Sequence, residues 1–415
     1  MANRTDIIIF GATGFTGKHA VKEAARLAKQ WKFSFGVAGR RKEALEAIVK
    51  EFAGDYEKIP VIIADLKDNE SLEKMTEQAK VLVNCSGPYK FYGEPVVKAC
   101  VKTRTNHVDV SGEPLYMETI QLKYNKAAQD AGIYIVSACG FDSVPCDLGV
   151  IFTQKVFDGT VNSIETYLNW NSLKNSSGPT LHYATWESAV YGLANASELR
   201  PLRQKLYPEK LPSFTPKLKP RCIVHKNSIS PGWSIEFPGA DRSVVRRTQN
   251  FLYNEYNQRP AQIYTYMTLK SFWTLVSTIL VGAVFSVMVK FSWSRNLLLK
   301  YPGFFSAGAI SHEGPSDEKM ESMEFSVTCV AQGWKEISSE GKSHDKKVVT
   351  KVSGINPGYG ATCTMLMLSA IMILNESDKM PKKKGVLPPG AAFGKTSYIE
   401  QLNKNGVTFE VLSKL

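Results

Sequence analysis

The sequence predicts an α/β fold in which a doubly wound parallel sheet is followed by an inserted mixed α+β second domain. Three observations indicate this. Over the first 149 residues, short apolar runs typical of buried strands alternate with helical periodicity. Most of these runs end at Gly, Asp or Ser, the edge where parallel sheets bind ligands. After Gly149 the alternation stops, and longer extended segments follow.

The alternating part contains six predicted strands with helices between them. The predicted strands are Asp6 to Phe10, Phe33 to Ala38, one within Tyr56 to Ala64, Val81 to Cys85, His107 to Ser111 and Ile133 to Ala138. The predicted helices are Lys18 to Trp31, Glu43 to Phe52, Asn69 to Gln78 with Asp68 as its N-cap, and one that Pro95 opens in its first turn.

The remainder of the chain predicts a mixed domain. The predicted extended segments are Val161 to Trp170, Arg221 to His225, Ser234 to Phe237, Ser243 to Arg247, Met323 to Val330 and Lys347 to Val352. Residues Leu199 to Lys219 are rich in Pro and Lys and predict a surface excursion. Helices are expected again over Ala361 to Leu374 and Thr396 to Lys404.

Composition narrows the classes of function. The 415 residues are 43% hydrophobic and 22% charged, which is typical of a folded globular protein. The formal net charge is +12, yet zinc-finger spacing, RNP-like strands and long basic tracts are absent, so nucleic acid is not an expected partner. Seven cysteines without CxxC spacing indicate reduced thiols in a cytosol-facing protein, and no metal site is expected. A strand beginning at Asp6 leaves no signal peptide to expect.

A glycine turn follows the first strand and opens the first helix, which is the context a nucleotide-binding turn requires. Glycine permits the sharp turn, the approach of a pyrophosphate to the backbone, and close packing of helix on strand. We therefore expect a Rossmann-type domain whose phosphate site is this turn. Its candidate residues are Gly11, Thr13, Gly14, Phe15, Thr16 and Gly17.

The end of the second predicted strand favours NADP(H) over NAD(H). An acidic residue there would bind the ribose hydroxyls of NAD, but this chain has Arg40 and Arg41. Two guanidinium groups suit a 2′-phosphate, although the pair is also compatible with a solvated basic helix start. Asp65, after the third strand, is expected either near the adenine or as a helix N-cap.

Candidate catalytic groups should follow strands four to six, beside the nicotinamide. The loop with Ser86 and Gly87 is expected to flank the nicotinamide ribose, and Tyr89 is a candidate proton donor. Asp142 follows the sixth strand and ranks first among the acids. Asp109 and Glu113 are candidates to orient a base or a ribose, or to cap the following helix.

Five motifs together resemble those of the saccharopine dehydrogenase-like oxidoreductases, and the resemblance extends over most of the chain. The motifs are the glycine turn, Gly87-Pro-Tyr-Lys-Phe-Tyr-Gly-Glu-Pro-Val-Val97, His107-Val-Asp-Val-Ser-Gly-Glu113, Cys139-Gly-Phe-Asp-Ser-Val-Pro-Cys-Asp-Leu-Gly149 and Pro388-Pro-Gly-Ala-Ala-Phe-Gly394.

The resemblance implies an NAD(P)-dependent reductase with an inserted substrate domain and a C-terminal segment that packs back on the first domain. The family includes saccharopine-forming enzymes and trans-acting enoyl reductases, and its animal-type members are associated with lipid droplets and membranes. On this basis the chain divides into residues 1–150, the dinucleotide-binding domain; 151–355, the substrate and dimerisation domain; and 356–415, a C-terminal helical segment.

An apolar stretch, Ser271 to Val289, contains no charged residue and is nearly long enough to span a bilayer. Trp273 and Trp293 lie near its ends, and three basic residues follow it. A full span would place the C-terminal segment across the membrane from the first domain. We therefore expect in-plane attachment to a membrane or lipid-droplet surface, with a buried core helix or a homodimer contact as the alternatives.

The expected function is that of a membrane-surface reductase that uses NADPH on a lipid-like carbonyl, imine or activated alkene. The expected location is a lipid droplet or a cytosol-facing membrane surface, with a mitochondrion-associated or cytoplasmic location as alternatives. The competing functions are a soluble saccharopine-type amino-acid dehydrogenase and a non-catalytic nucleotide-binding protein of lipid surfaces.

Overall fold

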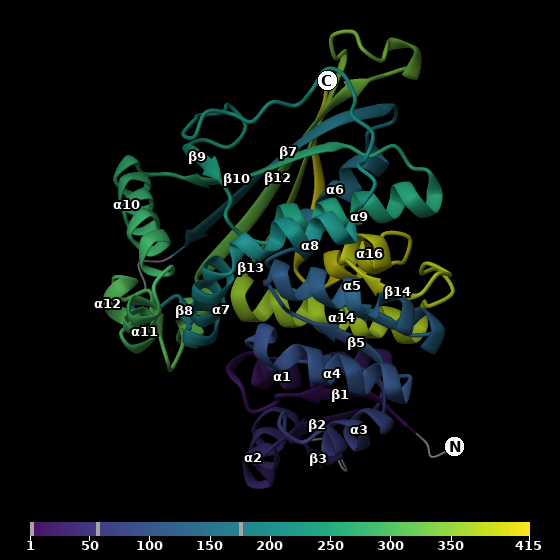
Figure 1. Cartoon of the computed structure of the whole chain (residues 1–415), viewed down its shortest axis with the longest axis vertical. Helices are drawn as coiled ribbons and strands as arrows, with labels where there is room; N and C mark the ends of the chain where they lie inside the picture. The colour runs from purple at the N-terminus through teal and green to yellow at the C-terminus, as the bar shows by residue number, and fades with distance from the viewer. Residues whose placement is uncertain (1–3, 55–58, 174–176) are drawn as a thin grey trace.

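The computed structural model describes residues 4–54, 59–173 and 177–415. A helix-flanked sheet occupies the lower part of the view in Figure 1, and a second, more open sheet occupies the upper part. Helices near the centre lie between the two sheets, and a small group of helices stands at the left edge. The α/β prediction, with a doubly wound parallel sheet and a mixed second domain, is confirmed.

The first sheet has seven strands in the order β14-β6-β5-β4-β1-β2-β3, and all its pairings are parallel. Its strands are β1 Thr5–Phe10, β2 Phe35–Gly39, β3 Val61–Ile63, β4 Ala79–Asn84, β5 Asn106–Asp109, β6 Tyr134–Val136 and β14 Gly385–Leu387. Its helices are α1 Phe15–Trp31, α2 Lys42–Ala53, α3 Asn69–Glu77, α4 Tyr89–Thr103 and α5 Pro114–Ala131. Residues 55–58, part of the predicted third-strand region, lie outside the described residues.

Local sequence explains most of this sheet. Ile7, Ile8 and Ile9 of β1 are fully buried, because parallel strands are covered on both faces by helices. Helix α3 begins where predicted, since the Asp68 carboxylate accepts hydrogen bonds from the amides of Glu70 and Ser71.

Helix α4 corrects one prediction. It begins at Tyr89, so Pro95 lies inside the helix rather than in its first turn. The early start has a long-range cause: the Glu113 carboxylate accepts hydrogen bonds from the amides of Tyr89 and Lys90. Proline inside a helix leaves one backbone carbonyl without its usual donor, and the capped N-terminus offsets part of that cost.

The second sheet has six strands in the order β15-β13-β12-β7-β10-β9. Only the β7–β10 pairing is parallel. The strands are β7 Thr160–Ser172, β9 Trp233–Glu236, β10 Gln262–Leu269, β12 Met323–Trp334, β13 Lys346–Ile355 and β15 Val407–Lys414. Helices α6 Val144–Val156 and α9 Asp241–Tyr256 pack against it, and a short pair, β8 Leu181–His182 with β11 Ile310–Ser311, lies outside it.

Two extended segments predicted for this domain are wrong. Ser243 to Arg247 is part of helix α9, where Val244, Thr248 and Leu252 recur at four-residue spacing and are buried. Arg221 to His225 forms no strand and contributes an isolated bridge from His225 to Ser234. The predicted surface excursion begins with helix α8, Leu199–Leu206, which follows α7, Tyr183–Ala194.

The C-terminal segment contains strands as well as helices, and in this respect the prediction of a helical segment was wrong. After a π-helical turn, Pro357–Ala361, helix α14 Thr362–Asn375 packs on α1, β4 and β5. Strand β14 then joins the first sheet beside β6, and β15 joins the second sheet beside β13. Helices α15 Pro389–Phe393 and α16 Tyr398–Lys404 lie between these strands in sequence.

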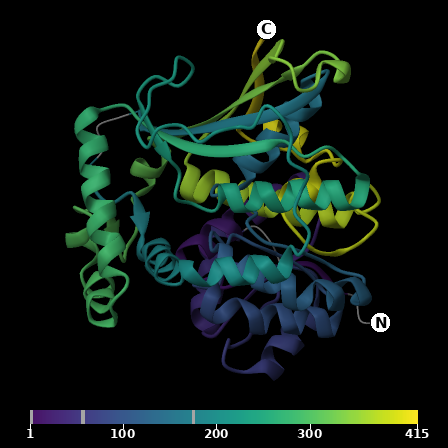
Figure 2. The ribbon, with the colours of Figure 1, turned by 45° about the horizontal axis from the view of Figure 1, so that its top comes forward.

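The helices at the left edge of Figures 1 and 2 form an apolar arm, residues 271–305. It consists of α10 Phe272–Met288, α11 Ser292–Lys300 and α12 Pro302–Phe305. Within α10 only Leu275 is buried. The alternative of a buried core helix for the apolar stretch is therefore wrong for the single chain. Among the described helices, Pro357–Asn375 is the one long and apolar enough to cross a membrane, and 83% of its most apolar stretch is buried inside the protein.

Candidate functional site

The three glycines of the turn have different surroundings. Gly11 has φ +77°, and a Cβ there would lie 2.5 Å from the Ser86 Oγ. A Cβ on Gly17 would lie 2.1 Å from the Gly11 carbonyl oxygen, so close packing of α1 on the backbone of the turn requires glycine. Gly14 is exposed, and the only atom near its Cβ position is the Gly11 oxygen at 3.2 Å. The space beside the Cα of Gly14 is therefore open to a ligand, while its own amide donates to the Gly11 carbonyl at 2.9 Å.

Helix α1 begins at this open point without a side-chain cap, because its N-cap residue is Gly14. The first amides of a helix have no intrahelical acceptor, and the helix dipole adds positive potential there. Ser86, from the loop after the neighbouring strand β4, lies against the turn. The turn thus has the properties of a phosphate site, and Thr13 and Thr16 lie half-buried within it.

The side chain of Phe15 packs against other aromatic rings of the protein, a role that the prediction of a nucleotide contact did not include. Its ring stacks on His182 with centroids 5.0 Å apart and meets Tyr359 edge-on at 4.5 Å. Gly314 lies so close that a Cβ there would be 2.6 Å from the ring. The ring therefore joins the glycine turn to the second domain, while the backbone of Phe15 remains part of the turn.

The Arg pair follows β2, which neighbours β1. The Gly11 amide donates to the carbonyl of Ala38, so the end of β2 adjoins the turn. Arg40 and Arg41 are both exposed, and neither guanidinium has a hydrogen bond or ion pair to the described residues. Both are thus available to an anionic ligand. Asp65 does not cap α3, because Asp68 does; its carboxylate accepts a hydrogen bond from the Lys67 amide.

Asp142 stands where the loops after β5 and β6 meet. Its carboxylate lies against Gly112, where a Cβ would be 2.9 Å from the Asp142 Oδ2. The side chain is exposed to solvent, although protein atoms surround it on the other sides. Because these protein atoms remove part of the carboxylate's hydration, the pKa of the carboxyl is raised above its ordinary value of 3.8. An exposed acid with a raised pKa at this sheet edge has the properties of a proton donor.

Tyr89 is placed differently. It is 5% exposed, and its hydroxyl donates to the Asn84 carbonyl at 2.8 Å and accepts from the Val110 amide at 3.4 Å. Burial raises the pKa of this phenol well above its ordinary value. Since the hydroxyl links the ends of β4 and β5, the geometry favours a packing role for Tyr89 and leaves Asp142 as the stronger candidate.

Two buried acids hold this edge of the sheet together. The Asp109 carboxylate accepts hydrogen bonds from the amides of Ser111 and Ala138 and from the hydroxyls of Tyr116 and Ser137. Burial raises its pKa to about 6 despite these bonds. Glu113 occupies the N-cap position of α5 but makes no side-chain cap bond there, and its carboxylate instead caps the preceding helix α4.

Helix α7 contacts both Glu113 and the apolar arm, and the sequence pattern did not predict this position. The Ser188 hydroxyl donates to the Glu113 carboxylate at 2.8 Å. On the side of the apolar arm, the Trp186 indole N–H donates to the Leu298 carbonyl, and its ring lies 4.9 Å from that of Phe285. Tyr359, also missed, accepts a hydrogen bond from the His182 amide. These contacts join residues far apart in sequence, and no local signal marks them.

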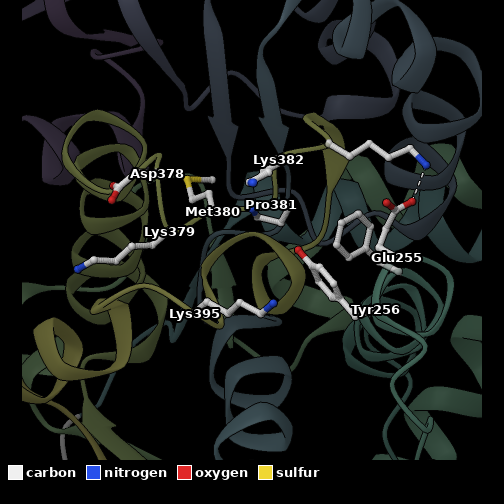
Figure 3. A pocket seen from close by; sticks show the side chains of 10 residues that line it. Glu255, Tyr256, Asp378, Lys379, Met380, Pro381, Lys382 and Lys395 are labelled. Carbon is white, nitrogen blue, oxygen red and sulfur yellow. Dashed lines mark hydrogen bonds and ion pairs between the residues drawn. The ribbon is translucent and has the colours of Figure 1, made fainter.

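A pocket of about 370 Å³ lies elsewhere, between the end of α9 and residues 378–383 (Figure 3). Lys384, beside it, donates to the Gly132 carbonyl, which precedes β6, so the pocket adjoins the opposite edge of the first sheet from the glycine turn. Its cations are largely engaged: Lys383 pairs with Glu255, and Lys395 lies 3.6 Å from the Tyr256 ring centroid. Within the described residues no group of His, Cys, Asp or Glu side chains is placed to hold a metal ion.

Comparison with known proteins places the chain in a family. Residues 7–136 match the family described as "Saccharopine dehydrogenase NADP binding domain". The human "Saccharopine dehydrogenase-like oxidoreductase" is 38% identical over 98% of this chain and 97% of its own length. The chain belongs to the saccharopine dehydrogenase-like oxidoreductases. The resemblance inferred from the five motifs is thereby confirmed.

Other relatives of this saccharopine dehydrogenase-like chain have informative names. A Caenorhabditis elegans protein named "Lipid droplet localized protein" is 34% identical, with 99% of each chain covered. An Arabidopsis thaliana relative, 34% identical over 99% of this chain and 97% of its own, is named a probable mitochondrial saccharopine dehydrogenase-like oxidoreductase. Apo saccharopine dehydrogenase (L-Glu forming) from Saccharomyces cerevisiae superposes with a TM-score of 0.58, covering 99% and 100% of the two chains at 14% identity, and so shares the fold.

Proposed function

We propose that this oxidoreductase is an NADPH-dependent reductase that acts on a lipid-like carbonyl, imine or activated alkene at a membrane or lipid-droplet surface. The observation that carries the proposal is the open space at Gly14, beside two unpaired arginines at the end of β2. The match to an NADP-binding family supports the choice of nucleotide. The likeness to yeast saccharopine dehydrogenase concerns the fold alone, so no substrate is inferred from it.

The residues of the turn suit a dinucleotide. The pyrophosphate would be held by the backbone amides of Thr13, Phe15, Thr16 and Gly17, because the amides of Gly11, Ala12 and Gly14 already donate to backbone carbonyls and the start of α1 has no side-chain cap. Arg40 and Arg41 would bind a 2′-phosphate, because each guanidinium presents a planar fork of donors. Ser86 and Gly87, in the loop next to the turn, would border the nicotinamide ribose.

The chemistry divides between cofactor and protein. When bound, the cofactor supplies a hydride to one atom of the substrate's double bond. Asp142, in its protonated form, gives a proton to the other atom, so that the bond is reduced and a carboxylate remains. Because the Asp142 side chain is exposed, solvent returns the proton. The raised pKa keeps a larger share of this carboxyl protonated near neutral pH than an ordinary aspartate would have.

The apolar arm supports the proposed location at a lipid surface. Seven side chains of α10 are large, apolar and exposed: Phe272, Trp273, Ile279, Leu280, Val281, Val284 and Val287. Residues 271–305 include no acid, and Lys290, Arg295 and Lys300 are their charged side chains. An exposed apolar face with a cationic flank matches the interfacial region of an anionic leaflet. The name of the nematode relative agrees with this location.

Helix α7 connects the arm to the proposed site. One side of it contacts the arm through Trp186, and another contacts Glu113, which caps the helix after the Ser86–Gly87 loop. A substrate that remains partly in the lipid would therefore reach Asp142 along α7. This arrangement favours an amphiphilic substrate whose reactive group lies close to its polar end.

Calorimetry with NADPH and NADH tests the nucleotide. The wild-type protein should bind NADPH at least about tenfold more tightly than NADH, and Arg40→Gln with Arg41→Gln should remove that difference. Lys50→Gln, an exposed change on α2, is the matched control. Equal affinity for the two nucleotides in the wild type would overturn the NADPH assignment.

Activity is tested separately, by following NADPH oxidation with vesicles that contain keto- or enoyl-lipids. Asp142→Asn should slow turnover about 100-fold, since general acid catalysis contributes that order of rate. It should also abolish the decline in rate at high pH that follows ionisation of the carboxyl. A rate unaffected by Asp142→Asn would remove this residue from the mechanism.

A further inference from the structure

A second concave site lies in the other domain, between α9, the start of β10 and residues 211–212. Its volume is about 230 Å³. The lining residues are Leu211, Pro212, Arg242, Arg246, Gln249, Pro260, Ala261, Gln262, Ile263 and Tyr264. The lining contains two arginines and no acid. We call it the Arg242–Arg246 pocket.

The two arginines are presented by one face of α9, because positions 242, 246 and 249 follow the i, i+4, i+7 spacing. Arg242 is held in place: its Nη1 donates to Glu236 at 2.6 Å, and its guanidinium lies over the Tyr264 ring at 4.4 Å. Its Nε is inaccessible and has no partner among the described residues.

Arg246 is the freer of the two. Its guanidinium has no hydrogen bond or ion pair to any described residue. Burial and the neighbouring cations Arg242 and Arg203 lower its pKa below the ordinary value. The charge of Glu118 acts on Arg246 without a hydrogen bond or ion pair between them, and the Glu118 carboxylate is itself bound by Arg203 and Ser243. Two positive groups therefore share the pocket, and no described carboxylate pairs directly with Arg246.

The next residue of α9, Arg247, is a buried cation that does not line the pocket. Arg247 is 2% exposed, and its Nε donates to the Gln121 Oε1 at 2.6 Å. Its Nη1 and Nη2 are buried and have no partner among the described residues. Asp147, the buried acid that it influences, has its pKa raised to about 7 and is incompletely ionised at neutral pH. A buried guanidinium without a hydrogen-bonded acid is costly, but Arg247 is not a ligand of the proposed site.

We propose that the Arg242–Arg246 pocket binds the phosphate group of a small soluble molecule, with both guanidinium groups as direct ligands. Arginine forks match the oxygens of a phosphate, and the volume admits a phosphate with a small substituent. The pocket is lined by the first residues of β10, whereas the apolar arm follows the last residue of that strand, and a strand of this length spans roughly 23 Å. A soluble ligand is therefore favoured over a lipid headgroup at the arm.

The site is independent of the proposed cofactor turn, and the experiment separates the two. Calorimetry with inorganic phosphate is carried out on the full chain as wild type, Arg246→Gln and Arg242→Gln. Each variant should weaken phosphate binding about tenfold or more. Arg200→Gln, an exposed change on α8 outside the lining, should stay close to wild type. Arg246 has no partner to lose, so this variant should unfold at the wild-type temperature.

Crystals soaked in tungstate locate the anion directly, and an anomalous peak between Arg242 and Arg246 is expected. A peak confined to the glycine turn, or unchanged phosphate affinity in Arg246→Gln, would overturn the proposal. Binding to vesicles of phosphatidylcholine and phosphatidate tests whether the pocket binds a lipid headgroup instead. If Arg246→Gln weakened vesicle binding but not phosphate binding, the soluble ligand would be abandoned in favour of a lipid headgroup.

Discussion

At the scale of single residues, the three glycines of the turn illustrate how far residue type alone can be interpreted. Their spacing after an apolar run predicts a nucleotide turn. The pattern does not show which glycines are required for close packing and which one leaves space for a ligand. Only the fold shows that Gly11 meets Ser86, that Gly17 meets the Gly11 carbonyl, and that Gly14 alone is open.

This division predicts opposite outcomes for two substitutions. Gly14→Val should fold, because its φ of −73° is ordinary and its Cβ has one close neighbour, but it should weaken NADPH binding about tenfold or more by blocking the approach of the phosphates. Gly17→Ala should destabilise the protein by about 2 kcal/mol or more, because its Cβ meets backbone. Calorimetry and thermal denaturation measure the two effects.

Gly192→Ala in α7 is the control for both, since a Cβ at that position meets nothing within 4 Å. If Gly14→Val bound NADPH as tightly as the wild type, the turn would not be the phosphate site, and the proposed function would lose its main support.

Asp147 allows a prediction of how stability depends on pH. Burial raises its pKa from 3.8 to about 7, although the Gly390 amide and the Thr248 hydroxyl donate to it. The stabilisation that belongs to its protonated form is complete below pH 3.8 and is lost as pH rises through about 7. Asp147→Asn cannot titrate. The unfolding free energy of the variant relative to wild type should therefore increase between pH 4 and 7, by at most about 1.4 kcal/mol per pH unit.

Urea unfolding at a series of pH values measures this difference. His107, whose pKa burial lowers to about 3, acts in the opposite direction, but it is present in both proteins and cancels. A difference that stayed constant with pH would show that Asp147 is ionised throughout.

At the scale of secondary-structure elements, periodicity predicted most strands and helices but not their environment. Helix α10 was expected from composition, yet only the fold shows that its apolar side chains face outward. Helix α9 was missed, because Val244 and Val245 favour a strand locally while the buried face recurs with helical spacing. Environment depends on contacts between distant segments, which periodicity does not contain.

The apolar arm predicts a selective loss of lipid binding. Leu280→Gln with Val284→Gln should leave stability nearly unchanged, because these side chains are 61% and 55% exposed. Binding to anionic vesicles, measured by flotation, should fall several-fold because each change removes apolar area from the lipid contact. Ser277→Gln on the same helix is the polar control.

Size-exclusion chromatography tests the alternative that the arm is a homodimer contact. If the double variant converted a dimer into a monomer and left vesicle binding intact, the arm would be a homodimer contact, and the lipid-surface proposal would be withdrawn.

At the scale of the whole molecule, the C-terminal segment ties the two sheets together. Strand β14 extends the first sheet, and β15 then extends the second. Helix α14 of the same segment also contacts α1 of the first domain, because the Thr364 hydroxyl donates a hydrogen bond to Glu23. Because each sheet includes a strand from this segment, neither can unfold without disturbing the other, and we expect a single cooperative transition.

Saturating NADPH should therefore protect the whole chain. At 100 times the dissociation constant, linkage adds about 2.7 kcal/mol to the unfolding free energy. Hydrogen exchange should slow in β12, Met323–Trp334, as well as around the glycine turn. NADH at the same concentration serves as the weaker ligand. Protection restricted to residues 1–150 would contradict cooperative unfolding.

Local sequence determined the parallel sheet, the glycine turn, the Arg pair and the apolar stretch, because each depends on neighbours within one strand or one turn. The tertiary structure alone decided that Glu113 starts α4 ahead of Pro95, that the Tyr89 hydroxyl joins two strands, and that the C-terminal segment extends both sheets. The physical reason is the same in each case: the deciding hydrogen bond or strand pairing joins residues that only the folded chain brings together.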